Sequence, residues 1–516
     1  MNQNKKILKN TFFLYIRMLL IIGVSLYTVK VIYNALGIEG YGLFNLIAGF
    51  LLLFSFFNSA MRSATQRYLN VAIASEKVTY INNTFSAAIN IHFFIAIMVL
   101  LLLETLGLWL VNNILNIPNE LIREANIVYQ CSILTTIISI ISVPYQSIII
   151  AKEKMNYFAY IGMLEVLLKL VGAICVFYSK DIINSLIFYS FSLLLIGVLI
   201  TTIYIWCASK KFSEEVKYNF ILDKKIYKDM LGFSGWNILG QVSVLSSNQG
   251  TVLIFNILIG LVINASLAIS QQIKSLLSSF VSNLQLAFNP QIVKSYAENN
   301  IVRHNVLVLN SSKYSLFLVS IMSIPFLIYT DYILILWLND NLPQAVSFFA
   351  KMIILMAIIE ALSGPLWMSA HAKGNIRNYQ IIISIIFLFN LPLTYVLLEL
   401  TKSVKLAFLS TVIISFIALI YRYIYFFNSK SVDRNLTLNY FRSLFLVLLF
   451  MGGIVYSQFF YLGKQDFNLS EKVVILLFIE FIYIIYLIAF CFSLNERKAL
   501  KQFVENKLTL YFKFKR

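Results

Sequence analysis

Long apolar runs alternate with short polar connections along nearly the whole chain. A helix that crosses a bilayer needs about 20 mostly apolar residues, and fourteen runs reach that length. The pattern therefore predicts an all-α integral membrane protein with about 14 transmembrane helices. The predicted spans are residues 12–34, 42–61, 84–108, 125–150, 157–178, 182–206, 230–258, 262–289, 306–330, 345–370, 379–399, 406–427, 441–461 and 472–494.

The composition agrees with a membrane protein. Hydrophobic residues make up 59% of the 516 residues and charged residues 12%, whereas a soluble domain has about 45–50% apolar and about 25% charged residues. The formal net charge is +18, which in a soluble protein would suggest a nucleic-acid partner. Here the basic residues lie in the connections between apolar runs, so membrane topology explains them and no nucleic-acid partner is expected.

Lys and Arg are distributed unevenly between the two sides of the predicted membrane. With the N-terminus placed in the cytoplasm, 29 of the 41 Lys and Arg fall in inside segments, six in outside segments and six within spans, where Arg422, Arg442 and Lys472 at span ends are counted with the adjacent segment. Basic loops stay on the cytoplasmic side, and an overlooked early span would exchange the sides of every later loop. We therefore expect both termini in the cytoplasm and only short loops outside.

Two parts of the chain share a pattern at a nearly constant offset. The motif Ser-x-Pro at 142–144 recurs at 363–365, 221 residues later, and Gly37 recurs as Gly260. Such a repeat predicts two six-helix lobes in the same orientation, with a central cavity between them near mid-membrane. The predicted parts are an N-terminal lobe at 1–206, a cytoplasmic linker at 207–229, a C-terminal lobe at 230–428, two extra C-terminal helices at 429–494 and a basic amphipathic tail at 495–516, which we expect on the anionic inner leaflet.

The second and eighth predicted spans each carry a row of polar side chains. Spacings of three and four residues place each row on one face of a helix. The repeat superposes the two rows, and two facing rows would line a hydrophilic, cationic cavity, because polar residues inside a membrane usually face protein or water. The rows are Ser55, Asn58, Arg62 and Gln66 in the second span, and Gln271, Lys274, Ser278, Ser282 and Gln285 in the eighth.

The first and seventh spans add further polar candidates. Small polar side chains of the seventh span can also serve helix packing alone, and Arg17 can extend its charge to the membrane surface, so both alternatives stay open. The expected substrate-binding residues are Arg17, Asn58, Arg62, Asn237, Gln241, Asn248, Gln271, Lys274 and Ser278.

Other ionisable residues form weaker patterns. Glu165 and Lys169, four residues apart, predict an ion pair within one helix. Glu104, Glu360 and Glu480 lie within spans, where a carboxylate can take up a proton, so coupling to a proton or sodium gradient stays open. The three His and four Cys have no ligand spacing, and no phosphate-binding loop motif occurs, so no metal or other cofactor is expected.

A cationic cavity favours an anionic cargo. A lipid diphosphate that bears sugars fits, because phosphates pair with Arg and Lys while sugar hydroxyls pair with Asn, Gln and Ser. The lipid chains would stay in the bilayer, which explains a polar cleft in so apolar a protein.

Five short segments carry a family resemblance. They read LGIEGYGLF at 36–44, ATQRY at 64–68, NILIG at 256–260, NPQIVKSY at 289–296 and AKGNIRNY at 372–379. With these segments the chain resembles, over nearly its whole length, the polysaccharide (O-antigen) flippase family of the multidrug/oligosaccharidyl-lipid/polysaccharide exporter superfamily.

The resemblance implies both architecture and activity. It implies fourteen helices, two six-helix lobes and a V-shaped cavity lined by cations of the first, second, seventh and eighth helices. Arg17, Arg62 and Lys274 are the positions here that fill those places. The implied activity is translocation of an undecaprenyl-diphosphate-linked oligosaccharide repeat unit from the cytoplasmic to the outer leaflet, by alternating access. The expected protein is therefore a flippase for cell-surface polysaccharide or lipopolysaccharide synthesis, and not an enzyme.

The same resemblance implies a location and partners. A bacterial inner (plasma) membrane is expected, with lipid-linked oligosaccharide, membrane lipids and other glycan-assembly membrane proteins as partners. A peptidoglycan lipid precursor flippase shares the architecture and stays open as the nearest alternative. A multidrug exporter of the superfamily typically has an acid in its first or seventh helix, and residues 12–34 and 230–258 contain none. A membrane-embedded glycan polymerase would need a larger outside loop, and a passive scaffold would need no cations in its cleft.

Overall fold

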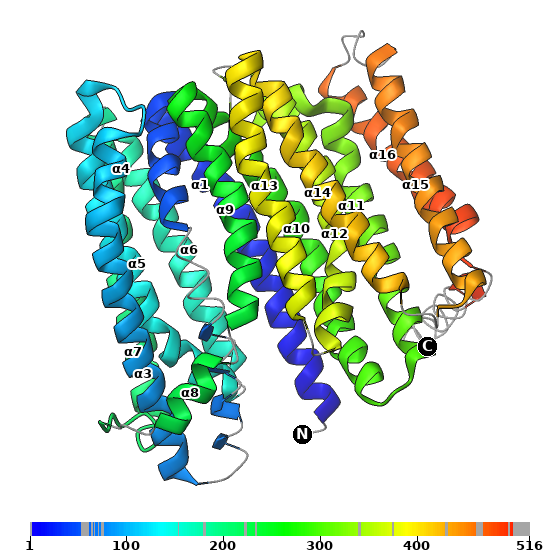
Figure 1. The fold of residues 1–516 in the computed structure, drawn as a ribbon. Helices are drawn as coiled ribbons and strands as arrows, with labels where there is room; N and C mark the ends of the chain where they lie inside the picture. The colour runs from blue at the N-terminus through cyan, green and yellow to red at the C-terminus, as the bar shows by residue number, and fades with distance from the viewer. Residues whose placement is uncertain are drawn as a thin grey trace, which may run out of the picture. The chain divides into compact units, whose positions relative to one another are not determined.

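Long helices, most of them of 23 residues or more, make up most of the described fold (Figure 1). No strand occurs among the described residues, which confirms the predicted all-α membrane class. The computed structural model describes residues 3–52, 61–62, 65–66, 68–70, 72–73, 77–152, 154–178, 182–220, 224–232, 235–338, 342–373, 376–428, 432–460, 468–493 and 496–498.

The helices follow the predicted apolar runs closely. Their order is α1 (Gln3–Leu52), α3 (Val78–Leu102), the π-helix η1 (Leu103–Gly107), α4 (Leu108–Asn113), the 3-10 helix η2 (Asn119–Leu121), α5 (Ile122–Ala151), α6 (Met155–Phe177), α7 (Ile182–Lys211), α8 (Lys224–Gly232), α9 (Gly235–Leu258), α10 (Leu261–Ala297), α11 (Ile301–Leu338), α12 (Val346–Ala372), α13 (Arg377–Thr401), α14 (Val404–Phe427), α15 (Arg434–Phe460), α16 (Leu469–Tyr486) and the π-helix η4 (Leu487–Cys491).

Eleven helical segments among the described residues are long and apolar enough to cross a membrane. They correspond to the predicted spans other than the second, seventh and eighth. The second is described only at residues 42–52 and 61. The other two form α9 and α10, of 24 and 37 residues, and their Asn, Gln and Ser side chains lower the hydropathy. At 1.5 Å per residue α10 is about 56 Å long, well beyond a hydrocarbon core of about 30 Å. The count of fourteen stays a prediction.

A glycine breaks the helical path at the same place in each repeat. Gly37 lies inside α1 with φ 68° and ψ −176°, so the expected loop between the first two spans is a one-residue kink. Gly260, its repeat partner, has φ 121° and separates α9 from α10. L-residues avoid this part of φ/ψ space. The backbone therefore supports the repeat at the position where the sequence shows it.

Contacts divide the chain into two compact units that each combine distant segments. Unit 1 contains residues 1–272, 337–346 and 380–414, and unit 2 contains 273–336, 347–379 and 415–516. Within unit 1, α5 packs against α3 and α7, and α1 packs against α6 (Figure 1). The predicted division into lobes at 1–206 and 230–428 stays a prediction.

The connection after α7 packs against other helices of unit 1 and is hydrogen-bonded to them. The Asn82 side-chain amide of α3 donates to the carbonyls of Glu214, Glu215 and Lys217, and its oxygen accepts from the Asn219 amide at 2.7 Å. Apolar residues of the same connection, Phe212 and Val216, join the core formed by α3, α5, α6 and α7. The predicted linker at 207–229 thus begins with the last residues of α7 and continues as a packed segment at 212–220, which we call the strap.

Hydroxyl groups join the helices of unit 2. Ser312 of α11 and Tyr440 of α15 are 2.7 Å apart, and Tyr440 is 2.6 Å from Tyr423 of α14. Ser320 of α11 is 2.6 Å from the Tyr483 hydroxyl of α16. Because apolar packing alone distinguishes poorly between helices and lipid, such hydrogen bonds help fix helix contacts in a membrane. The two extra C-terminal helices are thus anchored on α11.

Candidate functional site

The polar row of α10 occupies a half-exposed face. Gln271, Lys274 and Ser278 are each partly accessible, whereas the next residues on one side, Ile273 and Leu277, are buried. The helix therefore uses one stripe for packing and leaves the neighbouring polar stripe open. This is the arrangement expected of a helix that lines a hydrophilic path.

Lys274 is held by a carboxylate from another helix. Its Nζ lies 3.1 Å from Oε2 of Glu360 on α12, and the two side chains are 17% and 58% exposed. An unpaired ammonium in a low-dielectric setting is costly, so the carboxylate offsets that cost when no other anion is present. The helical spacing of polar residues predicted Lys274 as a site residue but did not predict its partner Glu360. The one signal available was an acidic residue in the middle of an apolar span.

Gln285, the last residue of the same row, has a structural role. Its amide donates to Ser315 Oγ at 3.1 Å and to the Ala361 carbonyl at 3.0 Å. A side chain at Gly364 of α12 would overlap the Gln285 amide, so the glycine permits the approach. Within unit 2 the polar row therefore changes from an open stripe to a helix-packing contact.

The structure describes only some of the remaining predicted site residues. Gln241 and Asn248 of α9 are half-buried. Arg62 is half-buried and interacts electrostatically with His92, which is buried on α3. The Asn58 residue and the side chains of Arg17 and Asn237 lie outside the described residues. The structure thus brings together Lys274 and a carboxylate, while a joint site of all nine residues stays a prediction.

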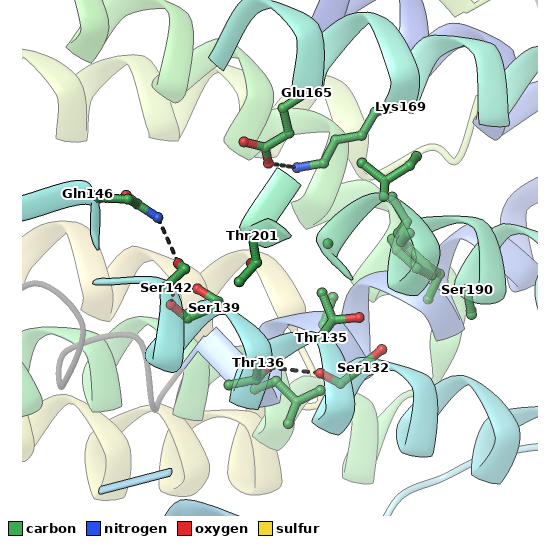
Figure 2. A pocket seen from close by; sticks show the side chains of 16 residues that line it. Ser132, Thr135, Thr136, Ser139, Ser142, Gln146, Glu165, Lys169, Ser190 and Thr201 are labelled. Carbon is green, nitrogen blue, oxygen red and sulfur yellow. Dashed lines mark hydrogen bonds and ion pairs between the residues drawn. The ribbon is translucent and has the colours of Figure 1, made fainter. Parts of the chain in front are cut away.

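A polar cavity of about 400 Å³ lies within unit 1, between α1, α5, α6 and α7 (Figure 2). Glu165 and Lys169 of α6 form one wall, and their ion pair of 2.6 Å confirms the predicted pair. Most of the hydroxyls from α5 donate to carbonyls of their own helix, and the Ser142 oxygen also accepts from the Gln146 amide at 2.7 Å. The polar side chains that α5 contributes are Ser132, Thr135, Thr136, Ser139, Ser142 and Gln146.

In the second repeat, buried side chains occupy the place that corresponds to this cavity. An offset of 221 superposes Lys169 on Asn390 and Ser190 on Thr411. Asn390 is fully buried and donates to Thr251 and Thr411 at 3.1 and 3.3 Å. The two repeats have therefore diverged, one towards a polar cavity and the other towards a closed hydrogen-bond network.

The two ion pairs differ in what they allow. Glu165 and Lys169 are on one helix, so no movement between helices separates them. Lys274 and Glu360 are on different helices, so either a competing anion or a helix movement can separate them. Only the second pair is therefore suited to an exchange of anionic partners. Among the described residues no group of three His, Cys, Asp or Glu is placed to hold a metal ion.

Comparison with known proteins finds structural relatives and no sequence relatives. No protein-family profile and no curated protein sequence matches the chain. A solved multidrug resistance MATE family transporter of the MOP superfamily, in an inward-facing conformation, is similar with a TM-score of 0.67 and 13% identity, covering 78% of this chain and 93% of that one. The lipid II flippase MurJ, in an inward closed conformation, is similar with a TM-score of 0.65 and 15% identity, covering 92% and 98%.

An outward-facing MATE transporter is also similar, with a TM-score of 0.61 at 13% identity over 81% of this chain and 94% of that one. At such identities these likenesses show the fold. The chain therefore has the fold of MOP-superfamily transporters.

Proposed function

We propose that this protein is a flippase that carries a lipid-diphosphate-linked oligosaccharide repeat unit from the cytoplasmic to the outer leaflet of a bacterial inner membrane, for cell-surface polysaccharide synthesis. The observation that carries the proposal is Lys274, a cation on the open polar stripe of a membrane helix. The shared fold supports a transporter that exposes such a stripe alternately to the two sides. The family resemblance of the sequence supports the cargo class.

The diphosphate exchanges partners with a carboxylate in this mechanism. In the empty protein Glu360 neutralises Lys274. A cargo diphosphate carries more charge than one carboxylate and competes for the same ammonium. The amide and hydroxyl groups of Gln271 and Ser278, on the same stripe, are suited to sugar hydroxyls. Release on the other side restores the ion pair, so the cation never lacks an anion.

The alternative cargo is the peptidoglycan lipid precursor. The structural similarity to the lipid II flippase MurJ over 92% of the chain supports this alternative. It is also a lipid diphosphate, so the same lysine would serve it. Drug export is less well supported. Residues 235–258, which form α9, contain no acidic residue, and the polar stripe of α10 presents a cation.

Proteoliposomes test the site and the cargo together. We would follow undecaprenyl-diphosphate oligosaccharide by its accessibility to an outside glycosidase, with lipid II in a parallel set. Lys274→Ala should lower transport about 10- to 100-fold, because a hydrogen bond to a charged group is worth about 1.5–3 kcal/mol, and Lys274→Arg should keep most activity. Lys294→Ala is the matched control, since Lys294 lies on the same helix in an exposed i,i+4 pair with Glu298.

A carboxylate variant separates binding from release. Glu360→Gln removes the competitor of the cargo, so the cargo should bind more tightly while turnover falls. Full transport by Lys274→Ala would contradict the assignment of the lysine. Transport of neither lipid by the wild type would contradict the proposed cargo class.

A further inference from the structure

A second charged pocket lies at one end of unit 2, apart from the polar stripe of α10. It has a volume of about 760 Å³ and is lined by residues of α11, α15, η4 and the segment that follows η4. Its charged lining residues are Lys313, Arg442, Glu496 and Arg497, and the amides of Asn310 and Asn439 also line it. None of these residues belongs to the proposed cargo site.

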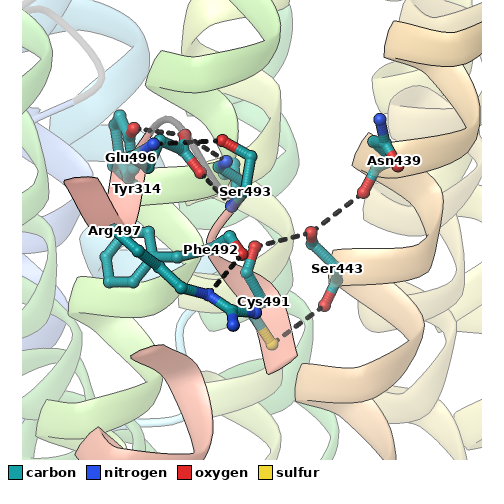
Figure 3. A network of polar contacts seen from close by, with 9 residues as sticks. Tyr314, Asn439, Ser443, Cys491, Phe492, Ser493, Glu496 and Arg497 are labelled. Carbon is teal, nitrogen blue, oxygen red and sulfur yellow. Dashed lines mark hydrogen bonds and ion pairs between the residues drawn. The ribbon is translucent and has the colours of Figure 1, made fainter. Parts of the chain in front are cut away.

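The wall formed by the residues that follow η4 is held by hydrogen bonds (Figure 3). The Ser493 backbone N–H donates to Glu496 Oε2 at 2.6 Å, and the Glu496 N–H donates to Ser493 Oγ at 3.3 Å, which is the reciprocal pattern of a capping box. The other carboxylate oxygen accepts from Lys313 Nζ and the Tyr314 hydroxyl, both at 2.5 Å. The pocket is therefore a built feature of the fold.

Glu496 is ionised near neutral pH. Burial raises the pKa of its carboxyl, but the hydrogen bonds from Lys313, Tyr314 and the Ser493 backbone outweigh that effect, so the pKa is lowered from its ordinary value of 4.5. The carboxylate thus neutralises Lys313 at a distance of 2.5 Å.

Two positive charges of the pocket are left without a carboxylate partner. Arg497 donates to the carbonyls of Phe492 and Ala489 at 3.1 and 2.5 Å, which are neutral acceptors. Arg442 is exposed, and no described carboxylate lies within ion-pair distance of it. With three cations and one carboxylate in its lining, the pocket favours an anion.

The pocket lies beside the end of a helical segment that is long enough to cross the membrane. The span of α16 and η4, Leu469–Cys491, has 23 residues, which is about 34 Å of helix and slightly more than the hydrocarbon core of about 30 Å. Its end is fixed beside Arg442, because Ser443 Oγ donates to the Cys491 carbonyl at 3.1 Å. Phe490, which also lines the pocket, is 53% exposed and offers apolar surface for an acyl chain.

We propose that this pocket binds the phosphate of an anionic phospholipid, with Arg442 and Arg497 as the phosphate ligands and Asn310 and Asn439 as hydrogen-bond donors. The seven Lys and Arg at 495–516 predict that this end faces the cytoplasm, where anionic lipid is concentrated. The phosphate would then contact both α11, through Asn310, and the C-terminal part of the chain, through Arg442 and Arg497. The site is distinct from the cargo site and does not depend on the proposed function.

The test measures lipid retention by the purified full-length protein in detergent. Dioleoyl phosphatidylglycerol is titrated against native mass spectra, with dioleoyl phosphatidylcholine as the neutral lipid. Arg442→Ala should weaken phosphatidylglycerol binding roughly fivefold, the contribution of one basic residue at a membrane surface, and leave phosphatidylcholine unchanged. Arg442→Lys should restore most of the affinity. Because Arg442 is exposed and has no described partner, the variant is expected to fold.

Arg434→Ala is the matched control, since Arg434 is an exposed residue at the start of the same helix and lies outside the pocket lining. Equal loss in the two alanine variants would mean diffuse surface attraction and would overturn the proposal, as would wild-type affinity in Arg442→Ala. A further arm adds inorganic phosphate at the lipid concentration. If it displaces phosphatidylglycerol, the pocket takes free phosphate and the lipid assignment is wrong.

Discussion

Gly37 and Gly260 show how a single residue shapes this membrane fold. Both have positive φ, and both stand at the junction between the first two helices of a repeat. At Gly37, φ 68° with ψ −176° belongs to a region that is almost exclusive to glycine. Nothing lies within 4 Å of a Cβ built there, so backbone conformation and not space explains the glycine.

Gly37→Ala should therefore destabilise the protein by about 1–3 kcal/mol, the usual cost of a residue held in a disfavoured φ/ψ region. Gly23→Ala, on the same helix, should be neutral or stabilising by up to about 1 kcal/mol, since Gly23 is helical with open space around its Cβ position. Thermal unfolding in detergent compares the two. Equal midpoints would mean that the kink tolerates an L-residue.

The residue scale also shows the limit of sequence reasoning about the site. The spacing of Gln271, Lys274 and Ser278 predicted one polar helical face, and that face is half-exposed. Periodicity could not show that Gln285 of the same row packs against Ala361, or that Glu360 pairs with Lys274. Both contacts join residues more than 70 positions apart, and a helical period carries no information about a neighbouring helix.

Among the elements, the strap at 212–220 differs most from its expected form. The basic connection at 207–229 predicts a linker between two halves, and the structure shows that part of it is tied to α3. Asn82 is 4% exposed, and its amide nitrogen, which has two N–H donors, lies within hydrogen-bond distance of three strap carbonyls. The Lys152–Glu215 ion pair of 2.8 Å adds a second tie, from the end of α5.

Asn82→Ala should release the strap, because it removes the side-chain hydrogen bonds that hold residues 214–219 on α3, each of which contributes about 0.5–1.5 kcal/mol. Trypsin applied to inside-out membrane vesicles should then cut after Lys217 faster than in the wild type. Asn83→Ala is the control, because Asn83 is the next residue of the same helix, partly accessible, with no hydrogen bond to the strap. Unchanged cleavage of Asn82→Ala would show that apolar packing and the Lys152–Glu215 ion pair hold the strap without Asn82.

For the whole molecule, the arrangement of the chain across the membrane follows from charge. The 29 to 6 distribution of basic residues predicts that the connection between α10 and α11 is cytoplasmic and that the connection between α13 and α14 is external. In a variant without native cysteines, Thr401→Cys should react with a membrane-impermeant maleimide in intact cells. Glu298→Cys should react only after permeabilisation. The reverse pattern would invert the predicted topology.

The sequence by itself determined the membrane class, nearly all helix positions and the repeat, because apolar run length and backbone glycines act locally along the chain. It also indicated the open polar stripe of α10. Only the tertiary structure decided the partner of Lys274, the closed network around Asn390, the packed strap and the pocket beside Arg442. Each of these depends on which helices meet, and that is set by side-chain shape and hydrogen bonding between segments far apart in sequence, which apolar periodicity does not encode.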